Sequence, residues 1–260
     1  MLCQFAVGEI SKPEQHGNNS VTHGSNTGIM KTNSSLGHSP NFSRAFTLIE
    51  LLVVIAIIAL LAGVALPVLQ NAMMTGQEAA ALQNARQIGM ALRAYANDQG
   101  GAYISGTNAY GQTIKSSNDA FRSLIPGYLD NEQVFVVPVS KDGPTTDNKM
   151  DTYTDMLKPG QNHFAYIEGL TETSPSLWPL VVDGGNANGD YTTVQSDLGG
   201  MWKGTKAVVV NTDGSAHLVP LLGPGNARYI PRFDDPTQDE LQLSAYMGNS
   251  VQLLEPATTN

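Results

Sequence analysis

An unbroken apolar run dominates the first third of this 260-residue chain. Residues 51–66 are sixteen consecutive uncharged apolar residues, and a single acid, Glu50, lies directly before them. With its flanks the run covers residues 44–69, which is long enough for a helix that crosses a bilayer, since a span needs about 20 mainly apolar residues. A secretory signal peptide places its small-residue cleavage site after the apolar run, whereas here the small residue Ala45 lies before it. The run therefore predicts a membrane-spanning helix rather than a conventional signal peptide.

The start of this run has a specific sequence. Residues 44–61 read R-A-F-T-L-I-E-L-L-V-V-I-A-I-I-A-L-L. This stretch resembles the amino-terminal segment of type IV pilins and type II secretion pseudopilins, and the resemblance extends to about residue 69. It implies that a prepilin peptidase cuts between Ala45 and Phe46, that the new Phe46 amine is methylated, and that the subunit assembles into a helical filament. The family usually has Gly before the cut, so Ala45 departs from its pattern.

Glu50 distinguishes this interpretation from a plain signal anchor that holds a periplasmic domain to the membrane. An ionised side chain inside a span costs about 2.5 to 3.5 kcal/mol at mid-bilayer, and a plain anchor gains nothing by keeping it. In the family, the acid at this position pairs with the terminal amine of a neighbouring subunit inside the filament. The resemblance therefore implies that Glu50 serves assembly. The family also has a proline at the place of Pro67.

Residues 1–45 are expected to form the cleaved leader. They are rich in Asn, Ser, Gly and His and show neither helical nor strand periodicity, as unstructured segments do. Because 45 residues is long for a leader of this family, Met30 is a second candidate for the true start. Lys31 and Arg44 place this side in the cytoplasm by the positive-inside bias, which sends the carboxy-terminal domain into the periplasm. The only cysteine, Cys3, lies in the leader, so the processed chain has no disulfide, which favours the pseudopilin branch.

The helical pattern continues beyond the membrane run. Apolar residues follow spacings of four, three, four and three, at Ala81, Ala85, Ile88, Leu92 and Tyr95, which marks one face of an amphipathic helix. We expect one helix from 46 to about 98, with a membrane and filament-core half at 46–69 and an amphipathic half at 70–98. Pro67, with Gly63 just before it, is expected to kink or locally melt this helix.

Residues 99–260 are expected to form one periplasmic domain with a small antiparallel sheet, which gives an α+β fold of the type IV pilin kind. Strands are expected at 163–167, 180–182, 206–211 and 217–219, with an extended run at 134–137. Short helices are expected at 120–125, capped by Asn118 and Asp119, and at 235–246, and residues 256–260 should fray. Asp213-Gly214 is a strong signal for a two-residue hairpin loop, and residues 206–219 resemble the terminal hairpin of a pseudopilin-like group.

One loop of the expected sheet carries a group of oxygen-bearing side chains around glycines. These residues are Asp183, Asn186, Asn188 and Asp190. Calcium takes about 6 to 8 oxygen ligands from flexible acidic loops, and major pseudopilins similar to this chain bind calcium in their sheet loops. The group is therefore a candidate calcium site. The alternative is an Asx-rich turn, in which Asn and Asp serve only local backbone hydrogen bonds.

Little else in the sequence points to chemistry or to nucleic acid. The stretch at 199–206, G-G-M-W-K-G-T-K, differs from a phosphate loop because that motif has Lys directly before Thr and a strand in front. His163 and His217 lie on expected strands without a carboxylate at ligand spacing, so satisfied or solvent-facing histidines are expected rather than a metal pair. The chain has 14 Lys and Arg against 23 Asp and Glu, whereas phosphate binding needs clustered basic residues. We therefore expect no enzyme and no nucleic-acid partner.

These inferences combine into a structural subunit, most similar to a major type II secretion pseudopilin. Its expected partners are other pilin or pseudopilin subunits, the prepilin peptidase and an inner-membrane assembly platform. It is expected in the bacterial inner membrane as a single-pass protein with its domain in the periplasm, and then in a filament. Two alternatives stay open: a type IV pilus subunit for adhesion, motility or DNA uptake, and a membrane-anchored periplasmic binding module.

Overall fold

The computed structural model describes residues 46–137, 145–186, 190–194, 199–232, 237 and 251–258. The expected leader, with Met30 and Ala45, lies outside the described residues, and so does the expected helix at 235–246 apart from residue 237. The chain divides into two units, Met1–Leu52 and Val53–Asn260. The sheet and its core belong to the second unit.

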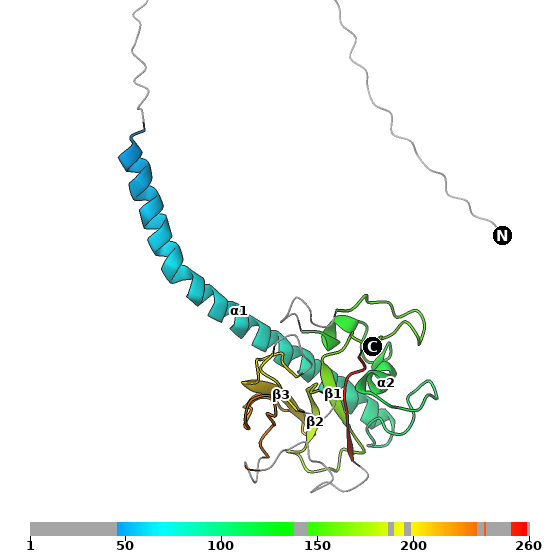
Figure 1. Cartoon of the computed structure of the whole chain (residues 1–260). Helices are drawn as coiled ribbons and strands as arrows, with labels where there is room; N and C mark the ends of the chain where they lie inside the picture. The colour runs from blue at the N-terminus through cyan, green and yellow to red at the C-terminus, as the bar shows by residue number, and fades with distance from the viewer. Residues whose placement is uncertain are drawn as a thin grey trace, which may run out of the picture. The chain divides into compact units, whose positions relative to one another are not determined.

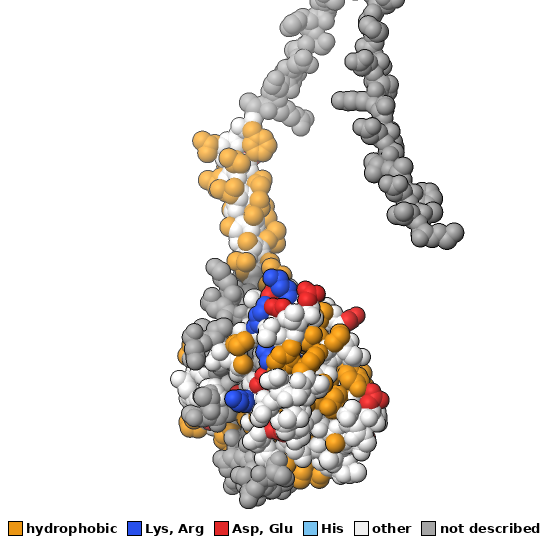
Figure 2. All heavy atoms as spheres, turned by 90° about the vertical axis from the view of Figure 1, so that its right-hand side faces the viewer, with side chains coloured by type: hydrophobic (Ala, Val, Ile, Leu, Met, Phe, Trp, Pro, Cys, Tyr) orange, Lys and Arg blue, Asp and Glu red, His pale blue; other side chains and the backbone are white. Residues whose placement is uncertain are grey.

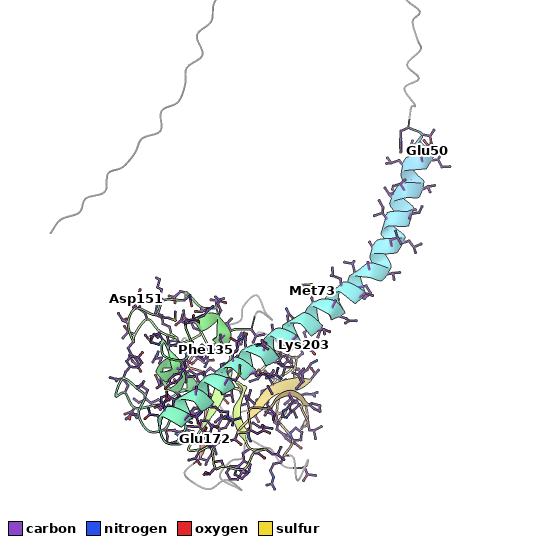
Figure 3. The ribbon with its side chains drawn as sticks, turned by 180° about the vertical axis from the view of Figure 1, so that it is seen from behind. Glu50, Met73, Phe135, Asp151, Glu172 and Lys203 are labelled. Carbon is purple, nitrogen blue, oxygen red and sulfur yellow. The ribbon has the colours of Figure 1, made fainter. Side chains whose placement is uncertain are left out.

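A single long helix, α1 (Leu48–Asp98), begins two residues after the expected start and ends where the sequence predicts. Pro67 lies inside it, so of the two outcomes expected at this proline local melting is wrong, whereas the helix does bend on this side of Met73. A proline removes one backbone N–H, and its ring crowds the carbonyl of the residue four positions earlier, which here is Gly63. Figure 3 shows the helix as an unbroken ribbon that curves on the amino-terminal side of Met73, which accommodates the proline without a break.

Five antiparallel strands form one sheet (Figure 1), in the order β4-β3-β2-β1-β5. The four predicted strands are confirmed to within one residue at each end: β1 (Phe164–Glu168), β2 (Pro179–Asp183), β3 (Lys206–Asn211) and β4 (Ala216–Pro220). Three of them are almost entirely buried, as valine-rich central strands are. The α+β fold expected from the sequence is confirmed.

A fifth strand, β5 (Gln252–Leu254), pairs with β1 at the other edge of the sheet. The sequence does not predict this strand, because three residues carry almost no periodicity. The expected fraying from residue 256 is also wrong as far as residue 258. Pro256 is buried, Gly160 N–H donates to the carbonyl of Ala257 at 2.8 Å, and Ala257 N–H donates to Asn118 Oδ1 at 3.0 Å.

Residues 212–215 separate β3 from β4, and three of them, 212–214, form the loop inside the hydrogen bond between Asn211 and Ser215, rather than the predicted two. Asn211 N–H donates to the carbonyl of Ser215 at 2.9 Å, which closes the ladder around the loop. Gly214 has a φ of 84°, a left-handed conformation that glycine adopts at low cost and that three-residue hairpins place at this position. The Asp-Gly pair thus predicted the hairpin correctly but not its loop length.

The segment before the sheet differs in detail from the prediction. The short helix is α2 (Ser117–Phe121), and a 3₁₀ turn, η1 (Arg122–Leu124), continues it. Its N-cap is Ser116, and Asp119 completes a capping box instead of serving as the cap itself. Val134 and Phe135 lie in a second 3₁₀ turn, η2 (Glu132–Phe135), so only the end of the expected extended run is extended.

The second half of α1 packs on β3. Its predicted apolar face is confirmed by four fully buried residues and by a tyrosine partly buried against the core: Ala81, Ala85, Ile88 and Leu92, and Tyr95. Small residues let the helix approach closely, since a Cβ at Gly89 would lie 2.7 Å from Val210 Cγ1. Polar contacts connect α1 to the chain near both ends of β3. Lys206 Nζ lies 2.5 Å from Glu78 Oε1, and Arg93 Nη1 donates to the carbonyl of Asp213 at 2.6 Å.

Candidate assembly and processing site

The first half of α1 exposes its apolar side chains. None of the residues in its most apolar 18-residue stretch is buried, and the helix is long and apolar enough to cross a membrane. Figure 2 shows apolar side chains covering the part of the helix that leaves the domain. Leu60 is 70% exposed and Val64 is 67% exposed, and large apolar residues stay exposed as far as Met74. A continuous apolar surface of this kind requires lipid or other protein to cover it.

The amino-terminal end of α1 is closed by a capping box. Thr47 Oγ1 accepts the backbone N–H of Glu50 at 3.3 Å, and Glu50 Oε2 accepts the Thr47 N–H and the Thr47 hydroxyl, both at 2.8 Å. This reciprocal arrangement satisfies two of the donors that a helix start leaves free, and the carboxylate also suits the positive end of the helix dipole. From the sequence, only an assembly role was expected for Glu50. The T-x-x-E spacing of residues 47–50 is the signal that would have revealed the cap.

Phe46, one of the two predicted processing residues, lies next to this cap. Phe46 is 73% exposed and directly precedes Thr47, while Ala45 lies outside the described residues. Cleavage before Phe46 would leave a free amine only one residue from the Thr47 N–H that Glu50 binds. Pro67 lies within the exposed half of the helix. Phe46 and Glu50 are thus exposed at the start of α1, Pro67 is exposed seventeen residues further along the chain, and their roles in processing and assembly stay predictions.

The candidate calcium residues are arranged differently from a metal site. Asp183 is 2% exposed, and its Oδ2 accepts hydrogen bonds from Trp202 Nε1 and from Val208 N–H, each at 2.7 Å. Asn186 Oδ1 accepts the N–H of Asp190 at 3.0 Å, and Asn186 N–H donates to the Asp190 carbonyl at 2.9 Å. These contacts occupy Asp183 Oδ2 and Asn186 Oδ1, two of the oxygens that would coordinate calcium, and they favour the Asx-turn alternative. Asn188 lies outside the described residues, and calcium binding stays a prediction.

Asp183 is nevertheless unusual electrostatically. Burial raises the pKa of its carboxyl to about 7, although the hydrogen bonds from Val208 and Trp202 lower it in part. Its second oxygen, Oδ1, is buried and has no hydrogen-bond partner. No group of three or more His, Cys, Asp or Glu side chains that could hold a metal ion occurs among the described residues.

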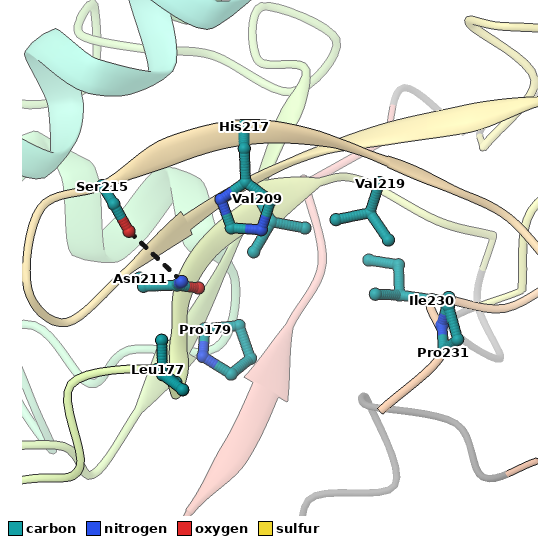
Figure 4. Close-up of a pocket in the computed structure, with 9 residues that line it drawn as sticks. All are labelled: Leu177, Pro179, Val209, Asn211, Ser215, His217, Val219, Ile230 and Pro231. Atoms are coloured by element: carbon teal, nitrogen blue, oxygen red, sulfur yellow. Dashed lines mark hydrogen bonds between the residues drawn. The ribbon is translucent and has the colours of Figure 1, made fainter. Parts of the chain in front are cut away.

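The two histidines take the two ordinary roles that the sequence predicts. His163 Nδ1 accepts the Val137 N–H at 2.7 Å, and burial lowers the pKa of His163 to about 4, so the ring is neutral. His217 is exposed on β4, beside a hollow of about 350 Å³ lined mainly by apolar side chains (Figure 4). Ser215 Oγ in this hollow accepts from Asn211 Nδ2 at 3.3 Å. Among the described residues that line the hollow, no hydrogen bond joins Ser215 to His217, so they form no pair of nucleophile and base.

Residues 40–66 match the family described as the prokaryotic N-terminal methylation motif, which is typical of type IV prepilin-like proteins. The matched segment includes Ala45, Phe46 and Glu50 and ends just before Pro67. No curated protein and no solved structure matches the chain. The chain therefore carries the processing motif of type IV prepilin-like proteins at the start of an exposed, membrane-capable helix.

Proposed function

We propose that this chain is a structural subunit of a type II secretion pseudopilus or of a related type IV pilus-like filament. The observation that carries the proposal is the combination of the methylation motif with a helix whose first half is apolar and exposed and whose second half is packed on a small sheet. In a membrane, lipid covers the first half. In a filament, the corresponding helices of other subunits replace the lipid.

The proposed sequence of events begins at the leader. Prepilin peptidase cuts between Ala45 and Phe46 and methylates the new amine, while the domain lies in the periplasm. The subunit then leaves the inner membrane through an assembly platform and packs among other subunits. Glu50 offsets its charge with the Phe46 amine of a neighbouring subunit, which fixes the axial register of the helices, and Pro67 shapes the helix that packs in the core. No step of this function requires catalysis by the subunit.

Processing is the direct test. Amino-terminal sequencing and intact-mass measurement of membrane-extracted protein should give a mature chain that begins at a methylated Phe46. Residues before Phe46 in the assembled form would contradict the proposal. A retained leader on a monomeric membrane protein would instead support the membrane-anchored binding module.

The choice between the two filament types needs a different observation. A surface filament seen by microscopy would support a type IV pilus subunit for adhesion, motility or DNA uptake. A short filament confined to the periplasm, together with a loss of secreted proteins on deletion of the gene, would support the pseudopilus.

A further inference from the structure

A shallow hollow of about 250 Å³ lies on the exposed flank of α1, within the half of the helix that packs on the domain. One wall is the helix, and the other is the turn that follows η1. Met90 is 53% exposed, more than any other large apolar side chain described after Met74. None of the residues that line the hollow is charged: they are Gln87, Met90, Ala91, Ala94, Tyr128 and Leu129. This surface, which we call the Met90 hollow, is therefore largely apolar and has no cover among the described residues.

The fold holds the second wall of the Met90 hollow in place. The backbone N–H groups of Tyr128 and Leu129 both donate to the Leu124 carbonyl at 2.9 Å. The Tyr128 hydroxyl donates to Asp98 Oδ2 at 2.6 Å, and its ring packs edge-on against Tyr95 with the ring centroids 5.8 Å apart. A partner therefore binds a surface that is already formed, so little conformational entropy is lost in ordering it.

The same chain carries a surface that fits this hollow. Residues 46–74 of α1 expose large apolar side chains that need a cover. Met90 lies 16 residues beyond Met74 on the same helix, which is about 24 Å along its axis. Copies that cross one membrane in the same direction have parallel helices. A neighbour displaced by about 24 to 66 Å along the helix axis therefore has part of its apolar half level with Met90.

We propose that the Met90 hollow is the docking surface for the apolar half of α1 from a second copy of this chain, an inference that rests on the proposed filament function. The uncharged lining suits an apolar helix, and side chains such as Leu60 and Leu61, which are 70% and 64% exposed, would lose their contact with water or lipid there. The contact joins two different surfaces of the chain. A heterologous contact of this kind leaves one surface free at each end, so the assembly grows instead of closing as a symmetric dimer does.

Disulfide crosslinking in assembled filaments tests this docking. The only cysteine, Cys3, precedes Phe46, so the mature chain is a cysteine-free background. Each variant combines Met90→Cys with one further cysteine, placed in turn at every position from 55 to 70. These positions lie 20 or more residues from Met90 on one helix, which is about 30 Å or more. A disulfide needs Cα atoms within about 7 Å, so every disulfide that forms joins two chains.

The pattern of crosslinks identifies the docked face. Oxidation of sheared filaments should give a ladder of multimers for positions three and four residues apart, which lie on one face of the apolar half, and only monomers for the opposite face. Leu177→Cys with the same set of second cysteines is the control. Leu177 is 47% exposed and lines the other hollow, beside β4, so these variants should stay monomeric.

A charge placed in the hollow gives a second readout. Met90→Glu keeps a good helix former at an exposed position, so cleavage and melting of the domain should stay near those of the wild type. Filament yield should fall about tenfold or more, because docking would bury the new charge against an apolar helix without a partner. Leu177→Glu is the matched control and should assemble like the wild type.

The outcomes separate the docking from the filament function. Filaments at the wild-type yield from Met90→Glu would overturn the docking. So would a Met90→Cys filament that gives no crosslink with any second cysteine but is protected from a water-soluble maleimide, because lipid or a different protein would then cover the hollow. Both results leave the filament function standing, whereas a wild-type chain that forms no filament contradicts both. If Met90→Glu does not fold, the crosslinks alone decide.

Discussion

At the scale of single residues, mutations can separate the role of Glu50 in the helix cap, which the structure shows, from the role in assembly that we propose for it. Its only described contacts are with Thr47, three residues away, so it contributes nothing to the core of the sheet. Glu50→Val should leave membrane insertion, cleavage and melting of the domain nearly unchanged. Filament yield should fall at least about tenfold, because removing one partner of a buried charge pair costs several kcal/mol. Comparison of processed and sheared-filament fractions measures this.

Glu50→Gln is the matched control, since Gln keeps the capping box but loses the charge. Failure of both variants to assemble would assign the defect to the charge. Assembly of Glu50→Gln alone would assign it to the helix cap. Normal filament yield from Glu50→Val would refute the pairing role and support the plain-anchor alternative.

His163 makes the second prediction at this scale. Because burial lowers its pKa from 6.5 to about 4, the folded state binds fewer protons than the unfolded state between these values. Stability is therefore lost as the pH falls from about 6.5 to about 4, by about 3 kcal/mol in all. His163→Asn keeps an acceptor for the Val137 N–H and should lack this loss. The difference between the melting curves of the two proteins at each pH isolates His163 from the buried acids, whose effect has the opposite sign.

Calcium binding by the loop that follows β2 is the subject of the third prediction at this scale. The predicted site should raise the melting temperature of the full chain in millimolar calcium relative to EDTA, whereas equal melting temperatures would support the hydrogen-bonded turn that the contacts of Asp183 and Asn186 favour. Calcium at a concentration a hundredfold above the Kd of such a site would raise the free energy of unfolding by about 2.7 kcal/mol. A rise in melting temperature of several degrees in calcium, which the substitution Asp190→Asn removes, would support the calcium site.

At the scale of elements, the close approach of α1 to β3 depends on Gly89. A Cβ there would lie 2.7 Å from Cγ1 of Val210, which is fully buried and cannot move freely. Gly89→Ala should therefore destabilise the domain by about 1 to 3 kcal/mol, despite the better helix propensity of Ala. Thermal or chemical unfolding measures the change.

Gly76→Ala is the matched control on the same helix, since a Cβ there would meet no atom within 4 Å. It should be neutral or stabilising by about 0.5 to 1 kcal/mol. Equal effects of the two substitutions would show that propensity, and not the contact with Val210, determines the result.

The elements that the sequence predicts well are those with a repeated pattern. The long helix follows from an apolar run and a regular buried face, and β1 to β4 follow from short valine-rich or aromatic runs between turn residues. The sequence did not reveal β5, η2 or the three-residue hairpin loop, because tertiary pairing and local cap geometry determine them. The same holds for Asp183: its residue type suggested a metal ligand, but the partners that define its role, Trp202 and Val208, are 19 and 25 positions away in the chain.

At the scale of the whole molecule, the contacts of α1 suggest where the chain divides into a folded domain and an apolar segment. Its first buried residue is Ala81, and Glu78 is the earliest α1 residue with a described contact to the sheet. A truncated chain that begins at Gly76 keeps both of these residues and loses the exposed apolar side chains up to Met74.

We therefore expect this truncated chain to be soluble without detergent, to sediment as a monomer and to melt within a few degrees of the domain in the full mature chain. The full chain should require detergent, because the apolar surface of residues 46–74 needs lipid or other subunits to cover it. A second truncation that begins at Arg86 is the control. It removes Ala81, Ala85 and the Glu78–Lys206 pair, and it should lose several kcal/mol of stability. If the chain that begins at Gly76 is unfolded or forms oligomers, then residues before Gly76 belong to the folded domain, and their exposure cannot be assigned to assembly alone.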